Sequence, residues 1–267
     1  MKKNLCCAAF LVLAAQLPLW GYSSESSPNP YKVVPEAVWA LATGGGTWVT
    51  EVQITNFATE SATIHVSFAY SGGMTGPFPL PDSISQLRSV RYSNILATID
   101  SLDSSGFVYY GRVGAIHFNA VGCPIQVQAK TVNGNYGKTF PGLNNFAGIT
   151  AALGRPMIIQ DLVQNATYRT SVGVASTSES GLLTATFTII DATGGTVGSP
   201  FSKTVSAGWF ISFNPFVQAG VPSGTYENCW LLIEVTGGDL EGLLMCYGSL
   251  ANNYTNDTYA LIAKMYN

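Results

Sequence analysis

The fold is decided by residues 167–191, TYRTSVGVASTSESGLLTATFTIID, which have a counterpart in residues 47–70, TWVTEVQITNFATESATIHVSFAY. Each stretch begins Thr-aromatic-X-Thr, continues with alternating apolar residues, breaks at a Ser/Thr/Glu cluster and then alternates again. Thr47 and Thr167 lie 120 residues apart, and the offset becomes 121 after the break. Self-similarity at this domain-sized spacing indicates a duplicated module and not a short-period solenoid.

Alternating apolar and polar residues are typical of half-buried antiparallel strands. Many short segments of this kind, separated by turn residues, favour β-sandwiches or barrels. Residues 125–136 and 243–254 form a second similar pair, and both end in Asn-Tyr. The sequence therefore predicts an all-β protein with two copies of one β module, in residues 32–145 and 157–267, joined by a junction in residues 146–156.

Within these modules, Val33 and Val34 are expected to form a short edge strand that Pro35 ends. Residues 88–96 and 107–110 are expected to be further strands, separated by a turn through residues 100–106. No amphipathic stretch reaches the length of a stable helix.

Composition points to the cell exterior. Charged residues make up 10% of the chain, far below the roughly 25% of an average soluble domain. Without Lys2 and Lys3, 10 basic and 15 acidic residues remain, a net charge of −5. Nucleic-acid binding needs clustered cations, and the sequence contains no such cluster, which excludes that class of function.

The N-terminal residues resemble an export signal. Lys2 and Lys3 precede an apolar stretch in residues 5–19, and small residues follow near position 23, so residues 1–23 are predicted to be a cleaved signal peptide. Residues 24–31 are read as a flexible leader. No later apolar run is long enough to span a membrane. The expected location is the periplasm, the cell surface or the extracellular space.

Two cysteines are candidates for a disulfide bond. If Gly237 and Gly238 form a two-residue hairpin turn, Cys229 and Cys246 lie opposite each other on adjacent antiparallel strands. Such a pair approaches disulfide geometry, and an exported protein meets an oxidising environment. The alternative is two buried thiols on one core face. Cys123 is left unpaired.

Several motifs resemble a tandem module of secreted bacterial proteins. They are residues 157–159 (MII), 164–174 (QNATYRTSVGV), 191–194 (DATG) and 207–209 (AGW), with residues 134–138 (GNYGK) and 140–142 (FPG) resembling the end of a first copy. The resemblance implies a pair of Ig-like antiparallel β-sandwich domains on an exported protein. It implies no activity and carries no catalytic residues across.

The sequence offers little catalytic chemistry. Neither His65 nor His117 has partners at metal-ligand spacing, so no metal and no cofactor are expected. A nucleophile elbow, Gly-X-Ser-X-Gly, does not occur. The enzyme alternative is an extracellular hydrolase, which would require a pocket that brings together His117, Asp103 and Cys123.

Aromatic residues are the remaining candidates for binding. Trp39, Tyr110, Trp209 and Tyr254 could stack on sugars if exposed, although most Trp and Tyr residues of a β-sandwich fill its core or rim. Tyr109 and Tyr110 point to opposite sides of a strand, so one of them is expected to be exposed. The preferred hypothesis is a non-enzymatic exported protein with a structural or interaction role at the cell surface or in the matrix. The alternative is a carbohydrate-binding protein, and the partner is then a protein or glycan at the cell exterior. Self-association through edge strands is a further expectation.

Overall fold

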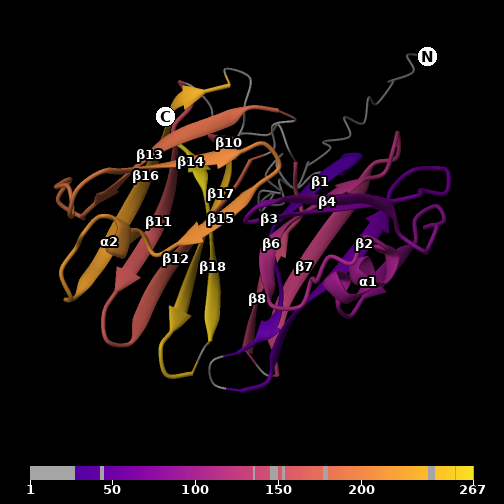
Figure 1. Ribbon diagram of the computed structural model, residues 1–267, viewed down its shortest axis with the longest axis horizontal. Coiled ribbons are helices and arrows are strands. Elements are labelled where there is room, and N and C mark those ends of the chain that lie inside the picture. Colours follow the sequence, from indigo (N-terminus) through magenta and orange to yellow (C-terminus); the bar gives the residue numbers. More distant parts are fainter. Residues whose placement is uncertain are drawn as a thin grey trace, which may run out of the picture.

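The computed structural model describes residues 28–42, 45–134, 136–144, 150–151, 154–176, 180–239, 244–255 and 257–266 (Figure 1). The predicted signal peptide, residues 24–27 of the leader and most of the junction lie outside these ranges. From the end of the leader, Asn29 forms an isolated β-bridge with Ile125. No helix within the described ranges is long and apolar enough to cross a membrane.

The first half forms one antiparallel sheet in the order β4-β3-β6-β1-β2-β7-β8, with β5 paired to β2 and β9 to β1. Its elements are β1 (Tyr31–Leu41), β2 (Thr47–Asn56), β3 (His65–Tyr70), β4 (Gly73–Pro79), β5 (Ser89–Tyr92), α1 (Ile95–Leu102), β6 (Arg112–Asn119), β7 (Ile125–Asn133), β8 (Tyr136–Pro141) and β9 (Leu143–Asn144). Phe68 and Phe118 from one end of the sheet share a core with Ile54 and Val127 from the other end. The sheet therefore folds over on itself in a sandwich-like arrangement.

The second half forms two antiparallel sheets. Its elements are β10 (Thr150–Ala151), β11 (Met157–Gln164), β12 (Tyr168–Ser176), β13 (Leu182–Ile190), β14 (Phe201–Ser206), β15 (Phe210–Phe213), α2 (Pro215–Gln218), β16 (Tyr226–Gly238), β17 (Leu244–Asn252), β18 (Thr258–Ile262) and β19 (Lys264–Met265). One sheet has the order β10-β17-β12-β15 with β18 on β17, and the other has the order β14-β13-β16-β11-β19. Their inner faces enclose a second core that includes Val172, Val174, Phe187 and Leu231.

The two halves pair their strands in the same way. β1 pairs with β6 and β9, as β11 pairs with β16 and β19. β2 pairs with β5 and β7, as β12 pairs with β15 and β17. β3 pairs with β4 and β6, as β13 pairs with β14 and β16, and β7 pairs with β8 as β17 pairs with β18. The difference is a short pairing between β1 and β2, which joins the two layers of the first half into one sheet.

The prediction that the chain consists mostly of antiparallel β-strands is confirmed, but several expectations about individual segments were wrong. β1 is not a short edge strand, because it runs through Pro35 and lies between β6 and β2. Residues 107–110 are not a strand, and β6 directly after them is central to the sheet. Residues 95–102 form α1, whose first turn is capped by the side chain of Asn94. Asn214, 120 residues later, caps α2 in the same manner.

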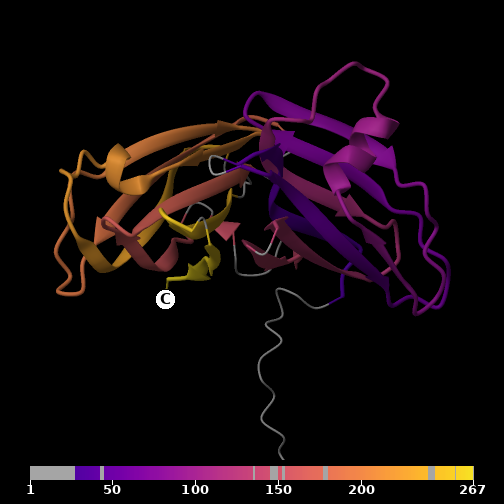
Figure 2. The ribbon, with the colours of Figure 1, turned by 90° about the horizontal axis from the view of Figure 1, so that it is seen from below.

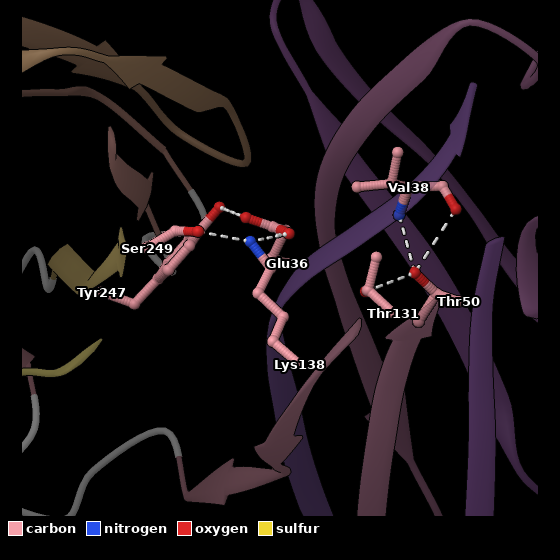
Figure 3. Close-up of polar contacts among 7 residues, drawn as sticks. All are labelled: Glu36, Val38, Thr50, Thr131, Lys138, Tyr247 and Ser249. Atoms are coloured by element: carbon pink, nitrogen blue, oxygen red, sulfur yellow. Dashed lines mark hydrogen bonds and ion pairs between the residues drawn. The ribbon is translucent and has the colours of Figure 1, made fainter. Parts of the chain in front are cut away.

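The repeated Thr-aromatic-X-Thr motif has a definite structural role at its last residue. In the first half, the Thr50 hydroxyl accepts a hydrogen bond from the Val38 N–H at 2.8 Å and contacts the Thr131 hydroxyl at 2.9 Å (Figure 3). In the second half, the Thr170 hydroxyl accepts from the Val163 N–H and donates to the Val163 carbonyl, both at 2.9 Å. Both threonines are buried. Each hydroxyl thus replaces the backbone partner that a strand loses where it diverges from its neighbour.

We expect Thr50→Val and Thr170→Val each to lower the free energy of unfolding by about 1–3 kcal/mol, because a buried backbone N–H loses its partner while the side-chain volume is kept. Urea denaturation of the purified variants measures the change. Thr50→Ser and Thr170→Ser keep the hydroxyl and are the matched controls. Equal losses in the Val and Ser variants would contradict this role for the hydroxyl.

The predicted disulfide between Cys229 and Cys246 is wrong. Both are free and buried thiols, and Cys123 is also free. Cys229 lies on β16 opposite Leu162, whereas Cys246 lies on β17 opposite Val174 in the other sheet. β16 and β17 therefore do not form the hairpin from which the pairing was inferred. Instead the chain passes from one sheet to the other between them, and the two thiols contribute to the same core.

Both thiols are expected to resist alkylation in the folded protein. Burial raises the pKa of Cys246 to about 12 and also raises the pKa of Cys229, so little of the reactive thiolate forms near neutral pH. Mass spectrometry after iodoacetamide treatment without reductant is expected to show slow labelling in buffer and labelling of both residues in denaturant. A peptide containing a Cys229–Cys246 bridge would contradict the structure.

Candidate functional site

The two halves lie side by side and share an apolar contact (Figures 1 and 2). Val33, Ala69, Ala115 and Phe140 of the first half belong to the same buried cluster as the core of the second half. Phe140 meets the ring of Tyr247 edge to face, with centroids 5.3 Å apart. The halves are thus packed against each other through apolar side chains.

A buried polar network crosses this contact (Figure 3). The Lys138 ammonium lies 2.6 Å from the Glu36 carboxylate and donates to the Ser249 hydroxyl at 2.7 Å. The Tyr247 hydroxyl donates to the other oxygen of Glu36 at 2.6 Å. Glu36 and Lys138 come from the first half, and Tyr247 and Ser249 come from β17. We call these four residues the inter-half network.

Local structure explains how the network forms. Tyr247 lies directly opposite Gly173 in the β12–β17 pairing, and a Cβ atom at Gly173 would overlap the tyrosine ring. Glycine therefore allows the ring to lie against the sheet while its hydroxyl reaches Glu36. Burial, followed by the negative charge of Glu36, raises the pKa of Tyr247 well above its usual value. The hydroxyl remains a donor throughout the physiological pH range.

The inter-half network forms one side of a cleft between the halves, with a volume of about 310 Å³. The cleft is lined by Glu36, Lys138 and Arg169, by the hydroxyl-bearing Thr131, Ser171, Ser212, Tyr247, Ser249 and Thr258, and by Val38, Trp48, Val113 and Ala251. This combination of hydroxyl groups, charges and one indole is suited to holding a small polar molecule.

The aromatic candidates do not form one site, and none of the four lines this cleft. Tyr110 is 42% exposed and meets the half-buried Trp39 edge to face, with centroids 5.4 Å apart. Trp209 is 38% exposed and Tyr254 is 74% exposed, both in the second half. Tyr109 is buried beside the exposed Tyr110, so one of the two is exposed as expected, although they lie in a loop and not on the predicted strand.

The residues considered for a hydrolase lie in separate environments. His117 is buried against the Tyr31 hydroxyl, and burial lowers its pKa to about 4. Asp103 accepts hydrogen bonds from the Tyr109 hydroxyl and the Ser105 N–H. Neither these two residues nor Cys123 line the inter-half cleft. Within the described ranges, no group of three or more His, Cys, Asp and Glu residues could hold a metal ion.

The cleft was not predicted from the sequence, although the repeat contains a signal for it. At the 120-residue offset, Glu51 and Gln53 on β2 correspond to Ser171 and Gly173 on β12. In the first half these positions face outward, and Glu51 there forms an ion pair with Arg91. The change to small residues in the second copy marks the face that the first half covers.

Comparisons with known proteins do not identify a family for this chain. No family model matches the chain, and no curated protein sequence matches it. A β-glucuronidase from Bacteroides uniformis is 10% identical with a TM-score of 0.18, and the alignment covers 91% of this chain and 27% of the glucuronidase. The VP2 subviral particle of infectious bursal disease virus is 14% identical with a TM-score of 0.20, over 90% of this chain and 72% of VP2. At these TM-scores neither likeness supports an argument about this chain.

We expect Lys138→Met to lower the free energy of unfolding by about 3–5 kcal/mol, because it leaves the buried Glu36 carboxylate without its cation. Chemical denaturation measures the effect. Lys130→Met is the matched control, since Lys130 is exposed on the neighbouring strand β7 and its replacement is expected to change stability by less than about 0.5 kcal/mol. Similar losses in the two variants would contradict the importance of the buried pair.

Proposed function

We propose that this chain is an exported, non-enzymatic protein that serves a structural or interaction role at the cell surface or in the extracellular matrix. The observation that carries the proposal is the buried inter-half network within an apolar contact. A network of this kind holds the two halves in one relative orientation, because separating them would expose apolar surface and break the two hydrogen bonds that cross between the halves, from Tyr247 to Glu36 and from Lys138 to Ser249. The protein then presents its outer faces as one rigid body.

We further propose that the two halves are Ig-like modules that arose by internal duplication. The equivalent strand pairings support this view, as do two polar contacts made by the same residue types 120 positions apart. These contacts are the Thr50 and Thr170 hydroxyls bound to the preceding strand, and the Asn94 and Asn214 side chains that cap α1 and α2. Agreement in both strand pairing and side-chain hydrogen bonds supports duplication more strongly than a similar content of strands would.

Carbohydrate binding by exposed aromatics is the second candidate function. The specific observation that favours it is the pair formed by Trp39 and Tyr110, in which an exposed ring is held by a second ring beside it. A prearranged aromatic surface loses little side-chain freedom when a sugar binds. Binding of the protein to a panel of soluble and insoluble polysaccharides, compared with Tyr110→Ala, tests this candidate.

Self-association through edge strands is a further proposal about partners. β14 pairs with β13 and leaves its other edge without a strand partner in the part of the chain that the structure describes. β4 is the corresponding edge of the first half, but Pro77 and Pro79 remove two of its backbone donors. β14 is therefore the better candidate for pairing with a second copy.

The preferred function is tested by expressing the full chain in a bacterial host and fractionating the cells. We expect the protein outside the cytoplasm, with a mature N-terminus near residue 23 by intact-mass measurement. Residual dipolar couplings of the mature protein are expected to give both halves the same alignment tensor. A cytoplasmic protein that retains residues 1–23 would contradict export, and two independent tensors would contradict the rigid body.

A further inference from the structure

The inter-half cleft contains polar groups that the fold itself does not use. Among the described residues, the Ser171 and Ser212 side chains make no hydrogen bond, although both line the cleft. Thr258 also lines the cleft, but its hydroxyl oxygen is buried out of reach of solvent and has no hydrogen-bond partner among the described residues. Ser171 is half-buried and Ser212 is exposed. The cleft therefore offers two serine hydroxyls to a ligand.

The cleft also has an uncompensated positive charge. Glu36 and Lys138 neutralise each other, whereas no carboxylate of the described residues lies within 4.0 Å of the Arg169 guanidinium. Arg169 is exposed and donates one side-chain hydrogen bond, to the Asn253 amide oxygen at 2.7 Å. A guanidinium has five N–H donors, so a face suited to a carboxylate remains available. The whole chain has a net charge of −3, so this positive cleft is a local feature.

The apolar part of the lining determines which kind of anion fits. Trp48 is half-buried and lines the cleft together with Val38 and Val113. An indole offers an apolar surface and an N–H donor, which match the C–H groups and the hydroxyls of a sugar ring. A simple inorganic anion would accept hydrogen bonds from the serine hydroxyls but would leave the indole ring and the two valines without contacts.

We propose that the inter-half cleft binds a small acidic sugar. Its carboxylate would lie on the guanidinium of Arg169, its hydroxyls would bond to Ser171 and Ser212, and its ring would lie against Trp48. A volume of about 310 Å³ is at the lower end of the roughly 300–1,000 Å³ of known ligand sites, which favours one or two sugar units. The proposal depends neither on export nor on Trp39, Tyr110, Trp209 and Tyr254.

The test is titration of the folded protein with D-galacturonate, followed by calorimetry and by amide chemical shifts in a ¹⁵N-labelled sample. D-galactose is the matched ligand control, because it has the same ring without the carboxylate, and acetate supplies the carboxylate without the ring. We expect saturable binding of galacturonate, at least tenfold weaker binding of galactose and acetate, and shift changes centred on Ser171, Ser249 and Thr258.

The variant Arg169→Gln is expected to weaken galacturonate binding at least tenfold, and Trp48→Ala is expected to weaken it as well. Arg91→Gln makes the same charge change on an exposed strand outside the cleft and is expected to bind as the parent protein does. Thermal unfolding confirms that each variant is folded before titration. Should Arg169→Gln fail to fold, Arg169→Lys keeps the charge, removes the bidentate donor and is expected to give an intermediate affinity.

Three results would overturn the proposal. The absence of saturable galacturonate binding up to its solubility limit would show that the cleft does not bind this class of ligand. Equal binding of galactose would remove the role of Arg169, and equal binding of acetate would reduce the site to a simple anion site. Equal losses of galacturonate affinity in Arg169→Gln and Arg91→Gln would show that galacturonate binds outside the cleft.

Discussion

The structure depends on satisfying backbone groups where a strand passes from one layer of a sandwich to the other. At such a point the strand loses its neighbour, and its N–H and C=O groups would be buried without partners. Thr50 and Thr170 solve this problem with a hydroxyl, which can accept from an N–H and donate to a carbonyl at once. Valine has the same shape without this capacity, and serine has the capacity without the methyl group that fills the core. The last threonine of each Thr-aromatic-X-Thr motif therefore has the same role, which is to bond to the backbone of the preceding strand.

The same solution has different consequences in the two halves. In the first half β1 pairs with both β2 and β6, so the two layers remain one hydrogen-bonded sheet. In the second half β11 and β12 belong to separate sheets, and Thr170 links them at the corner. The Thr170 hydroxyl therefore supplies a hydrogen-bonded link between two layers that also share an apolar core.

Periodicity predicted those elements whose burial differs strictly between their two faces. β2 begins at Thr47, and β7 and β13 alternate buried and exposed residues along most of their length, so their prediction succeeded. β1 and β6 were missed or shortened because both of their faces are buried, one by the first core and the other by the second half. Val33 and Val34 illustrate this, since adjacent residues of β1 belong to the two different cores. α1 was missed because eight residues are too few for a helical period to be evident, although Asn94 is a recognisable cap.

The disulfide prediction failed for a related reason. Cys229 and Cys246 are symmetrically placed about two glycines, and this symmetry implies a hairpin only if both strands lie in one sheet. The equivalent strands β6 and β7 of the first half likewise do not pair with each other, a fact that only the structure reveals. Local turn residues therefore fix the connection but not the sheet to which the next strand belongs.

The candidate site lies where the two halves differ at equivalent positions of the repeated sequence pattern. On the outer face of β2, Glu51 and Gln53 are large and polar, as expected for a surface in water, whereas Ser171 and Gly173 are small at the equivalent positions of β12. Small residues allow the first half to approach, and Gly173 gives Tyr247 the space to reach Glu36. Beside this contact, polar residues of the same face, among them the exposed Arg169, line the cleft between the halves. Glu51 and Gln53 are replaced by the smaller, uncharged Ser171 and Gly173 at the equivalent positions, and this difference between the two halves leaves room for both the contact between them and the cleft beside it.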